Sequence, residues 1–151
     1  MRLLVCGSRE WPGAWEDIAV HLPESGDVTI LHGACSRIDW RGVQTSVDML
    51  ADFAARGLGF SVETFPADWS LGRKAGPLRN ARMLAEGKPE RGLAFGALMK
   101  PAGPTKMAGL KSTGTGDMVG RLLAAGIPVR WVSAPGAVAC DITAMPAPEF
   151  T

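Results

Sequence analysis

The sequence predicts an α/β fold, a Rossmann-like three-layer α/β/α sandwich with a mostly parallel five-stranded sheet. Short apolar runs alternate along the chain with segments whose apolar residues recur at helical spacing. The first run ends in Gly7 and Ser8 and the second in His32 and Gly33, as buried parallel strands do where they enter a turn. Because strand–helix–strand crossovers in one sheet are right-handed, this alternation predicts a doubly wound sheet.

Five apolar runs are the predicted strands. In chain order they read RLLVCGS, DVTILHGA, FSVETFPA, RGLAFGALM and IPVRWVS. The third run alternates polar and apolar residues more than the others, so we expect one of its faces to be less covered.

The segments between the strands carry the helical spacing. Their apolar positions are Trp15, Ile18, Ala19 and Leu22, then Val43, Val47, Leu50, Ala51 and Ala54, then Leu78, Ala81 and Ala85, and finally Met118, Leu122 and Ala125. A loop rich in Gly, Pro and Lys, from about Lys100 to Gly114, is long enough to be a candidate lid over a ligand. We expect residues 1–133 to form the domain and residues 134–151, low in charge and rich in Pro and Ala, to be an irregular tail.

Composition narrows the class of protein. The 151 residues are 46% hydrophobic, which suits one compact core. Sixteen Lys and Arg against fifteen Asp and Glu give a net charge of +1, which disfavours a nucleic-acid or anionic-membrane partner. No apolar run approaches the roughly 20 residues of a membrane span, and the N-terminus lacks a signal-peptide core. The three cysteines form no C-x-x-C pair, so we expect reduced thiols and a cytoplasmic location.

Polar and glycine residues follow the predicted strands. In a doubly wound sheet, ligands bind beyond the carboxyl ends of the strands, where the strand order reverses. Candidate residues at that edge are Gly7, Ser8 and Arg9, then His32 and Gly33, then the cation-rich stretch 65–83, and finally STGTGD.

Two predicted helix starts suit an anion, because a helix N-terminus offers unpaired N–H groups and a partial positive charge. The first contains Gly76 and Pro77, with Pro77 at the first helical position, Arg79 and Asn80 in the first turn, and Lys74 beside them. The second contains Thr113, Gly114, Thr115 and Gly116, whose backbone and hydroxyls can approach a ligand closely. Asp117 suits a sugar hydroxyl better than a phosphate.

Several of these residues have an alternative structural reading. Trp11 and Trp69 either pack at the rim or stack on a base. His32 is either a ligand contact or a hydrogen-bonded structural histidine. The arginines of the third helix also fit an ordinary solvated face.

Common cofactor and catalytic motifs are absent. The stretch GPTKMAGLKST does not have the spacing of a Walker A loop, and no G-x-G-x-x-G follows the first strand. No G-x-S-x-G elbow occurs. Cys6, His32 and Cys35 lack metal-type spacing, so we predict neither a metal nor a cofactor.

Five motifs, VCGSREW, LHGAC, FPADW, GPLRNARML and GTGDMV, occur in this order. With them the chain, over about residues 1–133, resembles the YspA-type branch of the SLOG superfamily. These are Rossmann-like proteins related to the DNA-processing protein DprA and to the LOG cytokinin-activating phosphoribohydrolases. The resemblance implies a domain that binds a nucleotide or nucleotide-derived molecule, in sensing or processing and also in phage and bacterial conflict systems. Related domains often self-associate, so a homo-oligomer is a further expectation.

The resemblance assigns four groups of residues to the ligand site. They are Gly7, Ser8 and Arg9; His32 and Gly33; Asp68, Trp69, Gly76, Pro77, Arg79 and Asn80; and Gly114, Thr115 and Asp117. After HGAC, relatives resemble P-x-G-A-D, whereas this chain has an insertion that makes Asp48 rather than Asp39 the counterpart of the family aspartate. Where the phosphoribohydrolase signature has a glutamate, this chain has Met118. The resemblance therefore does not imply that this chain cleaves an N-glycosidic bond by the phosphoribohydrolase mechanism.

Three functions remain open. The first is binding of a nucleotide or nucleotide-derived small molecule at the carboxyl edge of the sheet, as a sensor or a sequestering or processing domain. The second is a nucleotide or nucleoside-phosphate hydrolase in which Asp117 stabilises an oxocarbenium-like ribose and Arg79 holds phosphate. The third is a DprA-like binder of single-stranded DNA that uses Arg73, Lys74, Arg79 and Arg82, which the low net charge disfavours.

Overall fold

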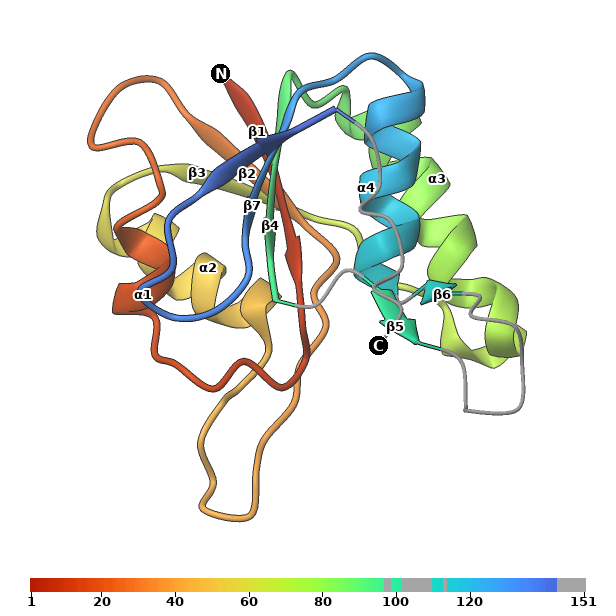
Figure 1. The fold of residues 1–151 in the computed structure, drawn as a ribbon, viewed down its shortest axis with the longest axis horizontal. Helices are drawn as coiled ribbons and strands as arrows, with labels where there is room; N and C mark the ends of the chain where they lie inside the picture. The colour runs from red at the N-terminus through yellow and green to blue at the C-terminus, as the bar shows by residue number, and fades with distance from the viewer. Residues whose placement is uncertain (97–98, 102–109, 113, 144–151) are drawn as a thin grey trace.

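The protein is an α/β fold built on one mostly parallel sheet (Figure 1). A computed structural model describes residues 1–96, 99–101, 110–112 and 114–143. The main sheet contains β1 (Arg2–Gly7), β2 (Thr29–His32), β3 (Ser61–Thr64), β4 (Arg91–Phe95), β7 (Val129–Val132) and β8 (Cys140–Ile142). Its strand order is β3-β2-β1-β4-β7-β8. The five predicted strands are all present and pair in parallel.

The sheet has six strands rather than the predicted five. The additional strand, β8, lies within residues 134–151, for which the sequence predicts an irregular tail, and it pairs antiparallel with β7. Its three residues carry no recognisable strand pattern. Tertiary structure supplies the reason, because β7 would otherwise present a row of unpaired backbone groups at the edge of the sheet.

The strand order reverses next to β1. The chain adds β2 and then β3 on one side of β1, and then returns to place β4 and β7 on the other side. The carboxyl ends of β1 and β4 therefore flank the reversal, which is where ligands bind in such sheets.

Helices lie on both faces of the sheet (Figure 1). They are α1 (Glu16–Ala19), α2 (Val47–Gly57), α3 (Ala75–Gly87) and α4 (Gly114–Ala124), and a 3₁₀ helix, η1 (Trp69–Lys74), precedes α3. Within β1, Leu3 and Val5 pack with the residues of α1 and α2, whereas Leu4 and Cys6 pack with those of α3 and α4. This alternation, with burial on both sides, explains why β1 is a continuous apolar run. The arrangement is compatible with the predicted Rossmann-like fold.

Two helices begin elsewhere than the sequence predicts. The pattern starting at Val43 predicts a longer second helix, but α2 begins at Val47. Residues 36–45 instead form a projecting hairpin, closed by a bridge between Ile38 and Gln44 (Figure 1). Helix α3 begins at Ala75, which moves Pro77 to the third helical position. Proline is tolerated there because N–H groups of the first turn have no helical partner.

The segment from Lys100 to Gly114, the candidate lid, lies largely outside the described residues. Its described ends are β5 (Met99–Pro101) and β6 (Leu110–Ser112), which pair antiparallel in a separate two-stranded sheet. Across the described residues, no helix combines the length and apolar character needed to span a bilayer.

Gly7, at the end of β1, provides a test of this packing. A Cβ there would lie 2.7 Å from Val47 Cβ and 2.8 Å from the Phe95 carbonyl oxygen. We expect Gly7→Ala to lower the free energy of unfolding by about 1–3 kcal/mol, because neither neighbour can move without displacing backbone. Urea denaturation measures this difference.

Gly120→Ala is the matched control. Gly120 lies inside α4, and a Cβ there meets nothing within 4 Å. This substitution should raise stability by about 0.5–1 kcal/mol through the helix preference of alanine. Equal effects of the two substitutions would contradict the packing described for Gly7.

Candidate functional site

A cavity of about 310 Å³ opens at the carboxyl end of β1, next to the reversal in strand order. Its walls are formed by the loops after β1 and β2, the first turn of α2, the middle of α3 and the start of α4. Its lining residues are Cys6, Gly7, Ser8, Arg9, Glu10, Gly33, Cys35, Arg37, Asp48, Arg79, Asn80, Met83, Gly114, Thr115 and Met118.

The structure brings many of the predicted site residues together here. Those that line the cavity are Gly7, Ser8, Arg9, Gly33, Asp48, Arg79, Asn80, Gly114 and Thr115. They come from five separate stretches of sequence, so the fold, rather than sequence proximity, assembles the site.

Backbone hydrogen bonds hold the loop after β1. The Ser8 N–H donates to the Phe95 carbonyl (3.0 Å), and the Ser8 carbonyl accepts from the Val47 N–H (3.0 Å). The next residue, Arg9, is exposed, and its guanidinium lies over the Trp69 ring at 5.1 Å. Ser8 is therefore fixed to β4 and α2, whereas Arg9 projects to the rim of the cavity.

Arg79 connects α3 to the loop after β2. Its Nη1 donates to the Gly33 carbonyl at 2.5 Å, and its Nε donates to the Asn80 side-chain oxygen at 2.9 Å. A Cβ at Gly33 would lie 2.1 Å from that Nη1, so a larger residue there would displace the guanidinium from this position. Nη2 lies 3.7 Å from Cys35 Sγ. Arg79 is therefore a structural contact as well as part of the cavity wall.

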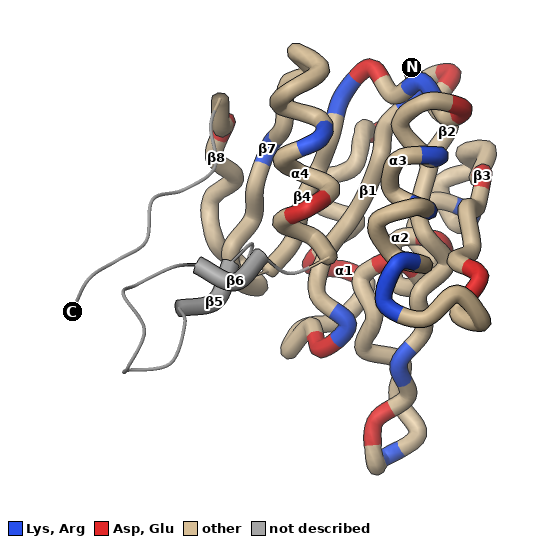
Figure 2. Tube along the Cα trace, turned by 90° about the vertical axis from the view of Figure 1, so that its right-hand side faces the viewer, with Lys and Arg blue, Asp and Glu red and all other residues tan. Residues whose placement is uncertain are grey.

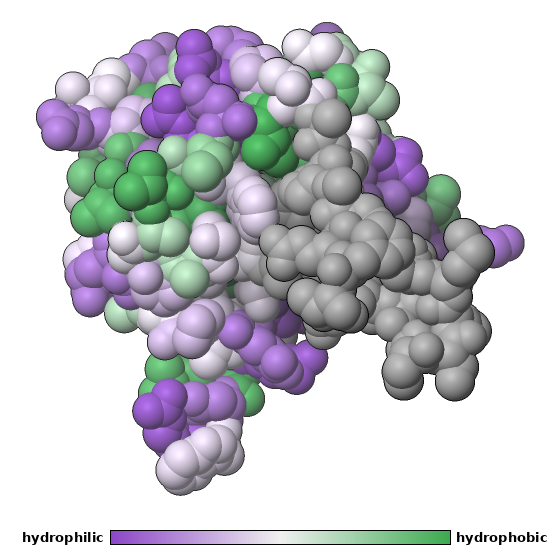
Figure 3. All heavy atoms as spheres, viewed as in Figure 1, coloured by the Kyte–Doolittle hydropathy of each residue, from purple (hydrophilic) through white to green (hydrophobic). Residues whose placement is uncertain are grey.

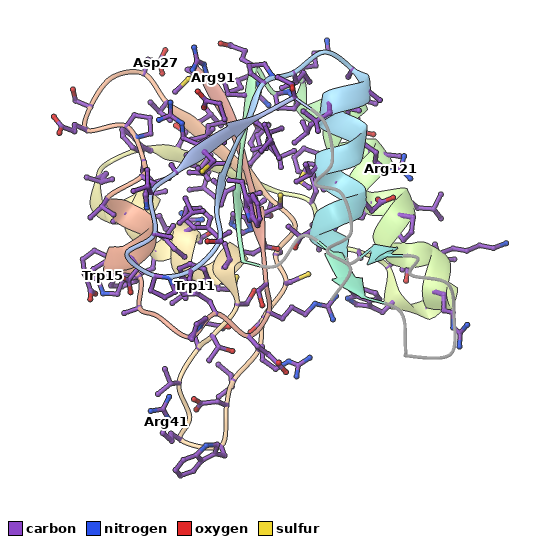
Figure 4. All side chains as sticks on the ribbon, in the orientation of Figure 1. Trp11, Trp15, Asp27, Arg41, Arg91 and Arg121 are labelled. Atoms are coloured by element: carbon purple, nitrogen blue, oxygen red, sulfur yellow. The ribbon has the colours of Figure 1, made fainter. Side chains whose placement is uncertain are left out.

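Asn80, in the second turn of α3, connects this helix to the start of α4. Its amide donates to the Gly114 carbonyl (3.2 Å) and to Asp117 Oδ2 (3.0 Å). The same Asp117 oxygen accepts from Arg121 Nε at 2.9 Å, and Arg121 projects outward from α4 (Figure 4). Asp117, the predicted catalytic carboxylate, is not among the residues that line the cavity.

Asp48 is a buried carboxyl group within the cavity wall. It is 6% exposed, lies in the first turn of α2, and accepts the Cys35 N–H through Oδ2 at 3.1 Å. Burial raises the pKa of Asp48, although His32, the Cys35 N–H and Arg79 oppose that increase. Burial also raises the pKa of the nearby Cys6 thiol, as does Asp48. The cavity thus contains a carboxyl group that burial biases toward the neutral form.

Of the two alternatives for His32, a ligand contact or a hydrogen-bonded structural histidine, the structure fits the second. Its ring is fully buried, Nε2 lies 2.7 Å from Asp52 Oδ2, and Nδ1 accepts the Ala34 N–H at 3.0 Å. These contacts place the proton on Nε2 and use both ring nitrogens. Burial acts to raise the pKa of Asp52, but hydrogen bonds from Arg56 and His32 lower it overall. Ala34 has a φ of 57°, so this histidine fixes an unusual backbone turn.

The two tryptophans have different positions. Trp11 is 2% exposed, packs edge-to-face against Phe95 at 5.7 Å and does not line the cavity, which fits the packing alternative rather than stacking on a base (Figure 4). Trp69 is 54% exposed and lies beside Arg9 at the rim. Trp69 therefore remains available to stack on a bound group.

Other predicted residues lie outside the cavity wall. Asp68 caps η1 by accepting the Ser70 N–H at 3.1 Å, and Gly116 is buried in α4. Lys74, Gly76 and Pro77 do not line the cavity. Thr113 lies outside the described residues.

Several residues that line the cavity are not predicted from the sequence as part of the site, notably Glu10, Cys35, Arg37, Met83 and Met118. Arg37 belongs to the projecting hairpin and pairs with Glu10 at 3.1 Å. Figure 2 shows both basic and acidic residues on the hairpin, and Figure 3 shows the hairpin extending beyond the molecular body. Glu10 directly follows Arg9, and this adjacency could have identified it, whereas only the hairpin fold brings Arg37 to the site.

The charges of the lining residues favour an anionic ligand. Three arginines, Arg9, Arg37 and Arg79, face two acids, Glu10 and Asp48. The first turn of α4 adds backbone N–H groups to the same wall. Among the described residues, no group of three or more His, Cys, Asp or Glu side chains is placed to hold a metal ion.

Comparison of the chain with protein-family models, with curated proteins and with solved structures gave no match.

The raised pKa of Asp48 predicts a specific pH dependence of stability. Because the folded state holds this proton more tightly than the unfolded state, the contribution of Asp48 to wild-type stability falls as pH rises above the unfolded pKa of about 3.9. Asp48→Asn keeps the acceptor for Cys35 but does not titrate. We therefore expect the stability of this variant, relative to wild type, to increase from pH 4 to pH 7 in urea denaturation.

Asp52→Asn is a control for which the expected change in stability with pH has the opposite sign. The pKa of Asp52 is lowered on folding, so its contribution to stability is present above about pH 3.9 and is lost as pH falls through the folded pKa. This variant should lose stability relative to wild type as pH rises toward 7. A constant difference between Asp48→Asn and wild type across this range would contradict the burial of an ionisable carboxyl group.

Proposed function

We propose that the protein binds a nucleotide or nucleotide-derived small molecule in this cavity, as a sensor or a sequestering or processing domain of the SLOG type. The observation that carries the proposal is the convergence of three arginines and the first turn of α4 on one cavity at the switch point of the sheet. Its volume of about 310 Å³ lies at the lower end of small-molecule sites, typically about 300–1,000 Å³. The ordered motifs that resemble those of SLOG proteins support the same proposal, and the mostly parallel α/β sheet is compatible with the Rossmann-like fold expected of them.

The cavity offers a separate contact for each part of a nucleotide. A phosphate group fits the first turn of α4 near Gly114 and Thr115, within reach of a flexible arginine at the rim. The exposed Trp69 ring, already stacked with Arg9, offers a face for the base. Asp48 can exchange a hydrogen bond with a ribose hydroxyl or a base amine.

A hydrolase is the second candidate. The observation that favours it is the buried carboxyl of Asp48, because a raised pKa is what a general acid needs near neutral pH. Asp117, the carboxylate first considered for this role, is held by Asn80 and Arg121 instead. No comparable observation favours single-stranded DNA, since Arg79 bonds within the protein and Arg82 pairs with Glu86 at 3.4 Å.

Binding can be tested with a nucleotide panel ranked by thermal shift, after mass spectrometry of any small molecule released on denaturation. For the best nucleotide, Arg9→Gln should weaken binding about 10- to 100-fold, as expected for one charged hydrogen bond of about 1.5–3 kcal/mol. The Arg9 side chain has no hydrogen bond or ion pair within the described residues, and the Arg9 carbonyl that accepts from Thr45 Oγ1 is unchanged by the substitution, so the fold should be unaffected.

Arg73→Gln is the matched control, because Arg73 is an exposed cation of η1 outside the cavity wall. Its affinity should stay within about twofold of wild type, given the small effect of a distant surface charge. Absence of binding across the panel would overturn the proposed function. Recovery of free base and sugar phosphate, abolished by Asp48→Asn, would identify the hydrolase instead.

A further inference from the structure

A second cavity, of about 600 Å³, lies at the opposite end of β1. Its lining residues are Met1, Leu3, Val20, His21, Leu22, Pro23, Glu24, Arg91, Gly92, Leu93, Pro128, Val129, Arg130 and Asp141. None of them lines the first cavity. The second cavity therefore has its own chemistry, and nothing in the proposed function uses it.

The shortness of α1 explains why this cavity exists. Helix α2 packs on β1, β2 and β3, whereas α1, a single turn, packs mainly on α2. The amino ends of β4 and β7 are consequently covered on this face by the segment that follows α1 rather than by a helix. That segment supplies Leu22 and Pro23 as apolar walls, and Pro128 lies opposite.

Sheet register brings two arginines into this cavity. Leu93 pairs with Arg130, and Leu3 pairs with Arg91. Leu3 and Leu93 both belong to the core on the α1 side, and side chains two residues apart share a face. Arg91 and Arg130 therefore project to the same side, from neighbouring strands, and Figure 4 shows Arg91 at this end of the sheet.

The two arginines differ in their partners. Arg130 donates through Nε to Asp141 at 3.1 Å, and both side chains are largely exposed, so the pair is weak. The Arg91 side chain makes no ion pair or hydrogen bond within the described part of the chain. The remaining acid of the lining, Glu24, is exposed. A planar guanidinium without a partner, above apolar walls, is suited to bind a carboxylate, sulfonate or phosphate through two hydrogen bonds.

His21 completes the polar side of the cavity. Its ring packs against Phe95 at 5.8 Å, and burial, followed by the charge of Arg130, lowers its pKa. A neutral imidazole beside the arginines offers a hydrogen bond and an aromatic face without attracting a cation.

We propose that this second cavity binds a small amphipathic anion, with its acidic group on Arg91 and its apolar part against Leu22, Pro23 and Pro128. The site is independent of the nucleotide site, because its residues lie at the amino ends of the strands. Val20, which is 75% exposed at its edge, provides further apolar surface for such a ligand.

The test uses 8-anilinonaphthalene-1-sulfonate, a dye that combines an apolar ring system with one sulfonate and fluoresces when it is shielded from water. We expect saturable binding to the folded protein. Arg91→Gln should weaken it by at least about tenfold, since it removes a charged hydrogen-bond pair. Val20→Glu, at an exposed position that leaves the fold intact, should weaken it as well. The uncharged analogue N-phenyl-1-naphthylamine should bind less tightly than the sulfonate.

Two matched variants distinguish the alternatives. Arg82→Gln removes an exposed arginine of α3, and Arg9→Gln removes one from the first cavity, so both should leave dye affinity within about twofold of wild type. Weakening by Arg9→Gln, with no effect of Arg91→Gln, would place the dye in the first cavity and overturn the proposal. Equal affinity for the uncharged analogue, or no saturable binding, would also overturn it. None of these outcomes depends on nucleotide binding.

Discussion

The contact between Arg79 and Gly33 holds the first cavity together. One guanidinium, from α3, reaches the backbone carbonyl that follows β2 and also holds the side chain of Asn80. Asn80 in turn fixes the start of α4 through the Gly114 carbonyl. Three elements that surround the cavity are thus connected by two adjacent side chains. Gly33 allows the guanidinium to lie directly against the backbone, because a Cβ at this position would displace it.

A second constraint is the burial of polar groups on this side of the sheet. Asp48 and His32 lie almost completely out of water, and each has its own partner, the Cys35 N–H for the carboxyl and Asp52 for the imidazole. The histidine network is closed, because both ring nitrogens are bonded. The Asp48 carboxyl instead faces a cavity, where burial destabilises its charged form. A group that reduces stability at neutral pH and lines a cavity is typical of a binding or catalytic site rather than of a structural core.

Both cavities follow from the way in which the helices cover one strand. β1 is central and buried on both faces, so ligands can reach it only at its two ends. At the carboxyl end, glycine-containing turns and helix starts leave space lined by arginines. At the amino end, the single turn of α1 leaves a gap over β4 and β7. The aromatic ring of Phe95 contacts His21 at one cavity, while its carbonyl accepts the Ser8 N–H at the other.

The sequence by itself determined the five parallel strands and the existence of the helices between them, because a buried parallel strand must be an apolar run and a packed helix must carry an apolar stripe. It also indicated that residues directly after β1 and β2 line the cavity, since the carboxyl ends of parallel strands in a doubly wound sheet share one edge. Only the tertiary structure decided the rest. Trp11 entered the core through its contact with Phe95, and β8 formed because β7 needed a partner at the sheet edge. Arg37 reached the cavity through a hairpin that shows no periodic signal, because long-range packing, rather than local spacing, decides which side chains meet.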